Sequence, residues 1–473
     1  MYSIKGLIFC CSCLLIAGCT IGPKYVRPSA PLATEYKGNK DWKVATPQDA
    51  AIKGEWWKVF NDPQLDALEA QVNISNQNIA MAEAQYDEAY ALVQAARSSF
   101  FPILTVDPSY KRSHGGVGSS SGVASPSGKN VSQTILGANV SWEVDLWGKI
   151  RQTITSYRAL AQASESELEN ARLSAQAQLA QDYFLLCTYD AQKKILDDTD
   201  AIYQKFYNLT KNQYASGVAA QSAVIQAKTQ LEGIEAQSID IGVQRSQMVN
   251  AIALLIGKPA SSFSLPTLTL PSSVPAVPVG LPSQLLERRP DIASAERTMA
   301  SANALIGVAE SAYYPTLTLS ASGSFQSQRS DLSDLFMSPN PLWSVGPALA
   351  ETIFDAGLRQ AQTAQAKAVY NQDVASYRET VLTAIQQVED NLAALNILDQ
   401  EKQVQDTAVM DAQRSVALET NQYKAGTVSA LDVITTQAIA LNDEKASATL
   451  QGERLNACVL LIEYLGGGWT APR

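Results

Sequence analysis

Histidine is almost absent from this chain, and charged residues are scarce. The 473 residues include one His, and 17% are charged, against about 25% in an ordinary globular protein. Only two of the six Cys lie beyond residue 19, so most His- and Cys-based metal sites and catalytic triads are excluded. The formal net charge of −10, without a basic run, argues against a nucleic-acid partner. We therefore predict no catalytic residue and no metal site, and expect that the protein is not an enzyme.

The N-terminus reads as an export signal that ends at a cysteine. Lys5 precedes the apolar stretch 6–16, which is too short to span a bilayer. Ala17-Gly18-Cys19 then resembles the bacterial lipobox, in which small residues precede the cut and the thiol takes diacylglycerol. We predict a lipoprotein signal peptide over residues 1–18. Cys19 would carry diacylglycerol and an N-linked acyl chain such as palmitate, with no other cofactor. The alternative is an ordinary signal peptide with an incidental cysteine.

Long apolar runs are also missing from the rest of the chain. No stretch of about 18 apolar residues follows residue 19, so we predict no transmembrane helix. Any membrane span must then consist of strands. The two remaining cysteines, Cys187 and Cys458, lie in apolar helical contexts and are expected to be small buried side chains. A disulfide between them is possible, but nothing in the sequence requires it.

The sequence contains an internal repeat, which predicts that the two halves of the chain share one topology. Phe101-Pro102 recurs as Tyr314-Pro315 and Arg151-Gln152 as Arg359-Gln360, with offsets of 213 and 208 residues. The Asn-Gln-Tyr triplet at 212–214 recurs 209 residues later. Six prolines between the halves forbid helix and central strand. The predicted divisions are a lipid-anchored segment over 19–63, a first repeat over 64–258, a Pro-rich linker over 259–283 and a second repeat over 284–473.

Each half predicts the same order of elements. A helix is followed by a strand pair, a very long helix and a return helix. In the strands, apolar and small polar residues alternate, as in Leu317, Leu319 and Ala321 against Thr318, Ser320 and Ser322. This pattern fits a wall between lipid and water, although a half-buried soluble sheet has the same period. The predicted bounds are 64–98, 101–146, 149–213 and 219–257 in the first half, and 290–312, 315–354, 357–422 and 429–465 in the second.

Four strands in one chain imply self-association. Such a sheet cannot close into a barrel, and open sheet edges are not tolerated in lipid. Small polar residues on the inward face favour an open lumen, and hence three copies over two. We predict an α+β membrane protein. In it, a trimeric β-barrel of twelve strands is continued by a long α-helical coiled-coil tunnel in the periplasm.

Several motifs give the chain a family resemblance. Residues 22–28 (GPKYVRP), 56–65 (WWKVFNDPQL), 281–292 (LPSQLLERRPDI) and 354–357 (FDAG) resemble segments of the outer-membrane efflux proteins of the TolC family, in its lipoprotein branch of OprM- and NodT-like proteins. The resemblance covers nearly the whole mature chain. It implies a homotrimer in the Gram-negative outer membrane that docks onto a periplasmic adaptor protein and an inner-membrane pump of the RND type. Each motif also has a structural interpretation, such as core anchoring by Trp56 and Trp57.

The resemblance places function at the hairpin tips. Residues 423–433 are similar to the family's periplasmic entrance, which implies a gate role for Tyr423 and Asp432, and for Tyr214 by the repeat. Gly217, Gly426 and Ser429 would lie where the adaptor docks. Purely structural roles are the alternative: both glycines would end helices, and residues 429–432 would form a Ser-x-x-Asp capping box. Val428 and Ala223 depart from the family pattern, which leaves an ion-pair latch undecided.

The sequence thus favours a passive exit duct for solutes or drugs, energised by a partner pump. Two alternatives remain: a non-conducting structural or adhesive coiled-coil lipoprotein, and a lipid-anchored hydrolase. The first, a non-conducting lipoprotein, would need no polar face on its strands, so the observed alternation counts against it. The second would need a nucleophile and a base, whereas the lone His114 lies in a Ser/Gly-rich loop. The transported substrate and the particular partners are not predicted.

Overall fold

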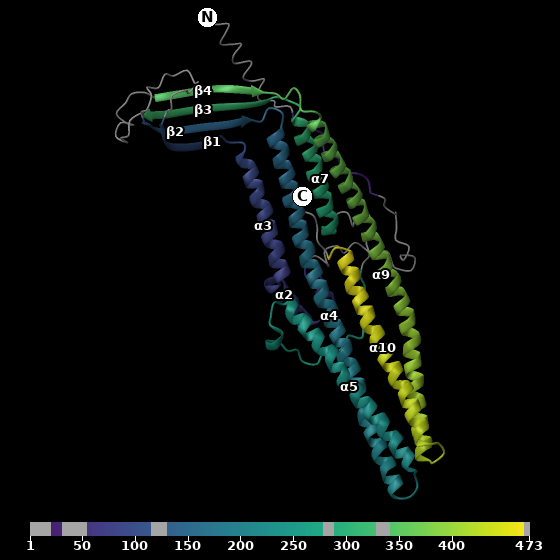
Figure 1. The fold of residues 1–473 in the computed structure, drawn as a ribbon. Coiled ribbons are helices and arrows are strands. Elements are labelled where there is room, and N and C mark those ends of the chain that lie inside the picture. The colour runs from purple at the N-terminus through teal and green to yellow at the C-terminus, as the bar shows by residue number, and fades with distance from the viewer. Residues whose placement is uncertain (1–19, 31–53, 115–129, 278–287, 328–340, 468–473) are drawn as a thin grey trace. The chain divides into compact units, whose positions relative to one another are not determined.

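The computed structural model describes residues 20–30, 54–114, 130–277, 288–327 and 341–467 (Figure 1). The predicted signal peptide, Cys19 and most of the Ser/Gly-rich segment between the first two strands lie outside these residues. Two units divide the described chain. The first comprises the described residues within 1–28, 87–163 and 295–376, and the second comprises those within 29–86, 164–294 and 377–473. The two longest helices contribute to both units.

The first unit contains one antiparallel sheet of four strands in the order β1-β2-β3-β4 (Figure 1). The sequence prediction of two strand pairs per chain is therefore confirmed. Within the described residues, β1 pairs only with β2, and β4 pairs only with β3. The strand bounds are Ile103–His114 for β1, Asn130–Val144 for β2, Thr316–Ser327 for β3 and Pro341–Ala350 for β4. His114, expected in a loop, is the last residue of β1.

The strand register gives the sheet one apolar and one polar face. Residues directly opposite each other in neighbouring strands share a face. Leu136 lies opposite Phe325, and Trp142 lies opposite Leu319. On the other face, Asn139 lies opposite Ser322. The polar row is held together across the strands: the amide of Asn139 donates to Asp107 at 2.8 Å, and the hydroxyls of Ser322 and Ser344 lie 2.9 Å apart.

The helix expected over residues 64–98 is wrong as one element. It is two helices, α2 (Pro63–Ser75) and α3 (Gln77–Ser98). Asn76 between them is extended, and its side-chain oxygen accepts from the backbone N–H groups of Asn78 and Ile79. Its amide donates to the carbonyl of Leu255 at 2.8 Å. An Asn can cap the helix that follows it, and this cap outweighs the continuous Ala/Gln/Glu pattern. In the second half, α7 (Pro290–Ser311) is one helix.

Two long helical hairpins follow the strand pairs (Figure 1). The first consists of α4 (Lys149–Ala215) and α5 (Gln221–Leu255), and the second of α9 (Leu358–Lys424) and α10 (Ala430–Tyr464). The 67 residues of α4 span about 100 Å at 1.5 Å per residue. None of the described helices is apolar over enough residues to cross a bilayer.

Each hairpin is fastened at equivalent points by polar side chains. In the first, the guanidinium of Arg245 on α5 contacts the buried carboxylate of Asp190 on α4 at 2.6 Å, and Ser238 donates to Asp197 at 2.7 Å. The second hairpin repeats both contacts 209 residues later, with Arg454 on Asp399 and Ser447 on Asp406. The internal repeat therefore extends to the pairs that hold each hairpin closed.

The second unit has a core shared by both hairpins. One buried cluster joins α4, α5 and α10 and contains Leu196, Tyr203, Ala227, Leu231, Ile234, Ile241, Ile434 and Leu441. Trp56 and Trp57 are also buried, as the structural interpretation of that motif predicts. Cys187 and Cys458 are free and buried, so the possible disulfide is not formed. Burial raises the pKa of both thiols, that of Cys458 to about 12.

The Pro-rich linker is bound to both hairpins. Arg245 donates to the carbonyls of Leu265 and Pro266, at 3.1 and 2.9 Å. Gln451 on α10 donates to the carbonyl of Pro271 at 2.7 Å. Apart from the short 3-10 turn η3 (Ala260–Ser262), the described part of the linker has no helix or strand. The prolines leave its carbonyls without ladder partners, and side chains of the hairpins supply donors instead.

Candidate functional site: the hairpin tips

Both hairpin tips reverse direction through a glycine with a left-handed backbone. Gly217 has φ +75° and Gly426 has φ +78°. In each turn, two N–H groups close back on the helix: Gly426 donates to Tyr423 and Thr427 donates to Gln422, and the first tip does the same one repeat earlier. This is the Schellman ending of a helix, which requires positive φ at the glycine. The interpretation of both glycines as helix ends therefore has direct support, while adaptor contact at Gly217 and Gly426 stays a prediction.

The two tips differ in how the return helix begins. Ser429 and Asp432 form a complete capping box at the start of α10. The backbone N–H of Ser429 donates to the Asp432 carboxylate at 2.9 Å, and the Ser429 hydroxyl donates to it at 2.7 Å. These hydrogen bonds lower the pKa of Asp432. In the first tip, Ala220 and Ala223 hold the equivalent positions, and α5 has no side-chain cap. Asp432 is thus part of the capping box and also an exposed negative charge, so the structure is compatible with both predicted roles.

Tyr423 joins the second hairpin to the first. Its hydroxyl donates to the side-chain oxygen of Gln213 on α4 at 3.1 Å. Its ring lies 5.8 Å from that of Phe206, also on α4. Its repeat counterpart Tyr214 is half-exposed. Of the three predicted gate residues, Tyr423 is therefore the one placed between hairpins, while Asp432 makes its hydrogen bonds within its own turn.

Gln213 and Phe206 were not identified from the sequence. Gln213 is part of the repeated Asn-Gln-Tyr triplet, so the repeat marked the position. Nothing in the triplet indicated that the partner of Tyr423 would come from the other half. Phe206 carries no repeat signal, because position 415 is Ser. Phe206 becomes a neighbour of Tyr423 only through the packing of one hairpin on the other.

The segment that follows Cys19 is bound closely to the first unit. The N–H of Ile21 donates to the carbonyl of Trp147 at 3.0 Å. Asn303 on α7 donates to the carbonyl of Pro23 at 3.0 Å, and the hydroxyl of Tyr25 donates to Glu296 at 2.5 Å. A Cβ atom at Gly148 would lie 2.9 Å from Thr20, so only glycine admits the segment there. The first described residue after Cys19 is thereby fixed beside the turn from β2 into α4.

The described residues contain no group of three or more His, Cys, Asp and Glu side chains that could hold a metal ion.

A family model described as outer membrane efflux protein matches two segments, residues 68–258 and 281–467. The chain belongs to the outer membrane efflux protein family. The two matched segments correspond to the two halves of the internal repeat.

Individual relatives match over almost their full length. The chain is 30% identical to the pyoverdine export outer membrane protein OpmQ of Pseudomonas aeruginosa, across 100% of this chain and 98% of that protein. It is 28% identical to the cation efflux system protein CusC of Escherichia coli, across 99% and 100%. The solved outer-membrane channel OprN superposes with a TM-score of 0.87 at 28% identity, over 95% of this chain and 100% of OprN.

These likenesses decide between the sequence-based alternatives. The recognition of the family and the predicted fold are confirmed, and so is a function in efflux at the outer membrane. The alternative of a non-conducting structural or adhesive lipoprotein is not supported. Lipid anchoring and the roles of the individual tip residues stay predictions.

Proposed function

We propose that three copies of this chain form the exit duct of a tripartite efflux system in the outer membrane. Three four-stranded sheets would close into one barrel of twelve strands, and the hairpins would continue the lumen into the periplasm. The duct is passive and has no catalytic residue of its own. Its energy comes from an inner-membrane pump of the RND type, reached through a periplasmic adaptor protein.

The sheet of the first unit is the observation that carries this proposal. Its two outer strands have no further partner among the described residues, and unpaired N–H and C=O groups are too costly to leave in lipid. The alternation of faces assigns the apolar row to lipid and the Ser/Thr/Asn row to the lumen. The inward side chains of β3 from Thr316 to Ser324 are all Ser or Thr, and a barrel of twelve strands lined in this way leaves a water-filled passage.

The contact of Tyr423 with Gln213 and Phe206 supports a closed state that rests on packing and a neutral hydrogen bond. It holds the second hairpin against the first at the periplasmic end of the tunnel. Asp432 would add three like charges around the three-fold axis, and such a ring attracts cations. The exposed tip around Gly217, Gly426 and Ser429 is left for the adaptor.

The cargo is set by the pump in this proposal. The named relatives export pyoverdine in one case and cations in another, and toluene in a third protein, TtgC of Pseudomonas putida, which is 29% identical. A wide lumen lined with small polar groups has little basis for such discrimination. Cys19 would hold the chain to the membrane through its lipid, beside the turn where Thr20 is bound.

The test compares two aspartates placed on opposite faces of β3. Leu319→Asp puts a charge on the apolar row and Ser320→Asp puts one on the polar row. We expect Leu319→Asp to abolish membrane insertion and the trimer, since a charge on the lipid-facing row is destabilising, most of all near the midplane, and each trimer would carry three of them. Ser320→Asp should assemble normally. Equal tolerance of both substitutions would contradict the assignment of faces.

A further inference from the structure

Within the chain, the second hairpin meets the first through α10 and α4. Gly452 on α10 lies so close to Thr188 on α4 that a Cβ atom at the glycine would come within 2.1 Å of the threonine hydroxyl oxygen. Further along, the amide of Gln192 on α4 donates to the hydroxyl of Thr449 on α10 at 2.9 Å. Ile434 on α10 belongs to the buried cluster shared with α4 and α5. These contacts define one junction between hairpins.

A closed ring of three copies requires a second junction. With three-fold symmetry, first and second hairpins alternate around the lumen, so the second hairpin of each copy must also meet the first hairpin of a neighbouring copy. In the internal repeat, α9 corresponds to α4, and α5 corresponds to α10. Since α4 and α10 form the junction within the chain, the helices left for the second junction are their repeat counterparts.

The two hairpins correspond residue by residue. The ends of α4 and α9 are 209 residues apart, and so are both the starts and the ends of α5 and α10. The Arg–Asp and Ser–Asp contacts that fasten each hairpin recur at the same offset. The helices are uninterrupted around Asp190 and Asp399, so the offset of 209 also holds for positions 188 and 397. A contact between hairpins can therefore be transferred without a change of register.

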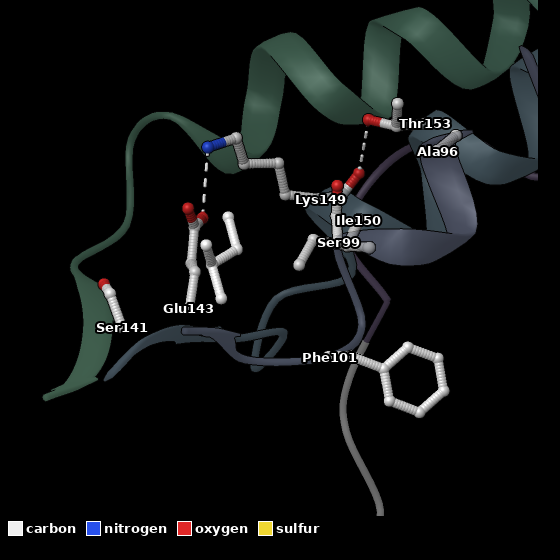
Figure 2. Close-up of a pocket in the computed structure, with 9 residues that line it drawn as sticks. Ala96, Ser99, Phe101, Ser141, Glu143, Lys149, Ile150 and Thr153 are labelled. Atoms are coloured by element: carbon white, nitrogen blue, oxygen red, sulfur yellow. Dashed lines mark hydrogen bonds and ion pairs between the residues drawn. The ribbon is translucent and has the colours of Figure 1, made fainter. Parts of the chain in front are cut away.

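The sheet end of the first unit does not share this equivalence. Trp147, in the turn after β2, lies with its ring 5.0 Å from that of Tyr314. The turn after β4 has no tryptophan, and a pocket of about 340 Å³ lies beside Phe101, the repeat counterpart of Tyr314 (Figure 2). The ion pair of Glu143 and Lys149, 3.0 Å long, borders this pocket. The transfer is therefore confined to the hairpins.

Positions that are buried at the junction within the chain have exposed apolar counterparts. Thr188 is 3% exposed, whereas its counterpart Ile397 is 62% exposed. Ile434 is 6% exposed, whereas its counterpart Ile225 is 58% exposed. The glycine that Thr188 meets corresponds to Val243, which is 55% exposed. Large apolar side chains exposed at these matching positions indicate a surface that another molecule covers.

We infer that α5 of one copy packs against α9 of a neighbouring copy as α10 packs against α4 within the chain, with Val243 against Ile397. This inference rests on the proposed trimer and assigns the surface through which its hairpins meet. The occupant is another copy, because both side chains are exposed in the single chain and its own helices do not cover them. Val and Ile are larger than the Gly and Thr at the equivalent positions, so the two helices lie further apart here than within the chain.

The hairpin tips continue this surface. Within the chain, Tyr423 donates to Gln213 at 3.1 Å, and both residues have counterparts in the repeated Asn-Gln-Tyr triplet. The half-exposed Tyr214 of the copy that supplies α5 then donates to Gln422 of the copy that supplies α9. Every junction of the ring thus carries the same Tyr–Gln hydrogen bond at its tip.

The direct test cross-links the two positions in the full-length protein in the outer membrane. Val243→Cys with Ile397→Cys should give covalent dimers and trimers with a short bismaleimide, because side chains on packed helices lie within its reach. Val243→Cys with Leu418→Cys is the control and should give no interchain product, because Leu418 lies about 30 Å further along α9. The single variants report any product of the buried native cysteines. The absence of an interchain product from the 243–397 pair would overturn the inference.

The mass of the same protein in detergent separates this inference from the proposed function. If the chain is a trimer and the 243–397 pair does not link, the assigned surface is wrong and the proposed duct stands. If the chain is not a trimer, the duct and the inference fail together. A trimer that links through this pair supports both.

A pair of acids gives a second test, with the opposite sign. The transfer sets Asp240 opposite Glu401, the counterparts of the hydrogen-bonded Thr449 and Gln192. Like charges across a junction repel each other, so Asp240→Asn should slow dissociation of the purified trimer about twofold at low salt. Glu401→Gln should add nothing in the Asp240→Asn background, because the repulsion is already gone.

The matched control for the acid pair lies on another face of α5. The repeat counterpart of Glu235 is Glu444, which accepts from Gln413 within its own hairpin at 2.6 Å. Glu235→Gln should therefore leave the dissociation rate unchanged. A rate for Asp240→Asn equal to that of the wild type, or additive effects of Asp240→Asn and Glu401→Gln, would refute the assigned junction.

Discussion

A close approach between the hairpins gives a sharp test of their packing. Gly452 on α10 is buried against Thr188 on α4. A Cβ atom at position 452 would lie 2.1 Å from the hydroxyl oxygen of Thr188 and 3.2 Å from its Cβ and Cγ2 atoms. Contacts under 3.0 Å are not tolerated by real Cβ atoms, so Gly452→Ala must move either the side chain or the helix.

Two opposing effects set the size of the change in stability. Ala in place of Gly in a helix interior stabilises by about 1 kcal/mol. Overpacking a filled interface costs about 1–3 kcal/mol. Thr188 has little freedom to turn away, because its hydroxyl donates to the carbonyl of Phe184 at 2.8 Å. We expect the clash to win, with a net loss of about 1–2 kcal/mol for Gly452→Ala.

Removal of the obstructing hydroxyl should reverse the sign. In a Thr188→Ala background the 2.1 Å contact is gone, and Gly452→Ala should then stabilise by up to about 1 kcal/mol. Gly242→Ala on α5 is the matched control: a Cβ atom there meets nothing within 4 Å, so it should stabilise in either background. The assay is the midpoint of denaturant unfolding followed by helical circular dichroism. A loss of stability for Gly452→Ala that persists unchanged with Thr188→Ala would refute the reasoning.

Further expectations concern the tip, a buried carboxyl group and the anchor. Asp432→Asn should lower cation preference at low salt while α10 keeps its N-cap, because the Ser429 side chain still accepts from the backbone N–H of residue 432. Unchanged selectivity would rule out the charge ring and leave only the capping role. Glu69 on α2 is fully buried, and neither carboxylate oxygen has a hydrogen-bond partner among the described residues. Burial and Asp66 raise its pKa well above 4.5. The native state then holds a proton that the unfolded chain loses, so stability falls as pH rises from about 4.5 toward the native pKa. Glu69→Gln should flatten this slope in urea titrations at pH 5 to 8, and an unchanged slope would assign it to another group. Cys19→Ser should leave an uncleaved precursor without radioactive palmitate, whereas persisting label would disprove acylation at Cys19.

The strands and hairpins could be predicted because their patterns are local. Alternation in Leu317 to Ser322 fixes a strand and its faces, and positive φ at Gly217 and Gly426 follows from the turn that each hairpin needs. The internal repeat added the order of elements. The alternation and the turn signals depend on residues within one or two turns of each other, and the repeat is found by comparing the sequence with itself, so a single sequence contains all of them.

The remaining features depend on contacts between distant segments. Asn76 breaks the first helix because its side chain reaches Leu255, 179 residues away. Tyr423 meets Gln213 and Phe206 because one hairpin lies on the other. The fit of Gly452 against Thr188 is likewise a property of packing. No periodicity encodes which side chains meet across such an interface, and hence these partners could not be predicted.

The conducting tunnel is tested most directly by single-channel recording of the purified protein in a planar bilayer. The wild type should insert and give small conductance steps, because Tyr423 holds the second hairpin against the first. Tyr423→Ala should give larger steps, and Tyr423→Phe, which keeps the ring on Phe206 and loses the hydrogen bond to Gln213, should fall between them. Inserted protein that shows no conductance in any of the three forms would contradict the account.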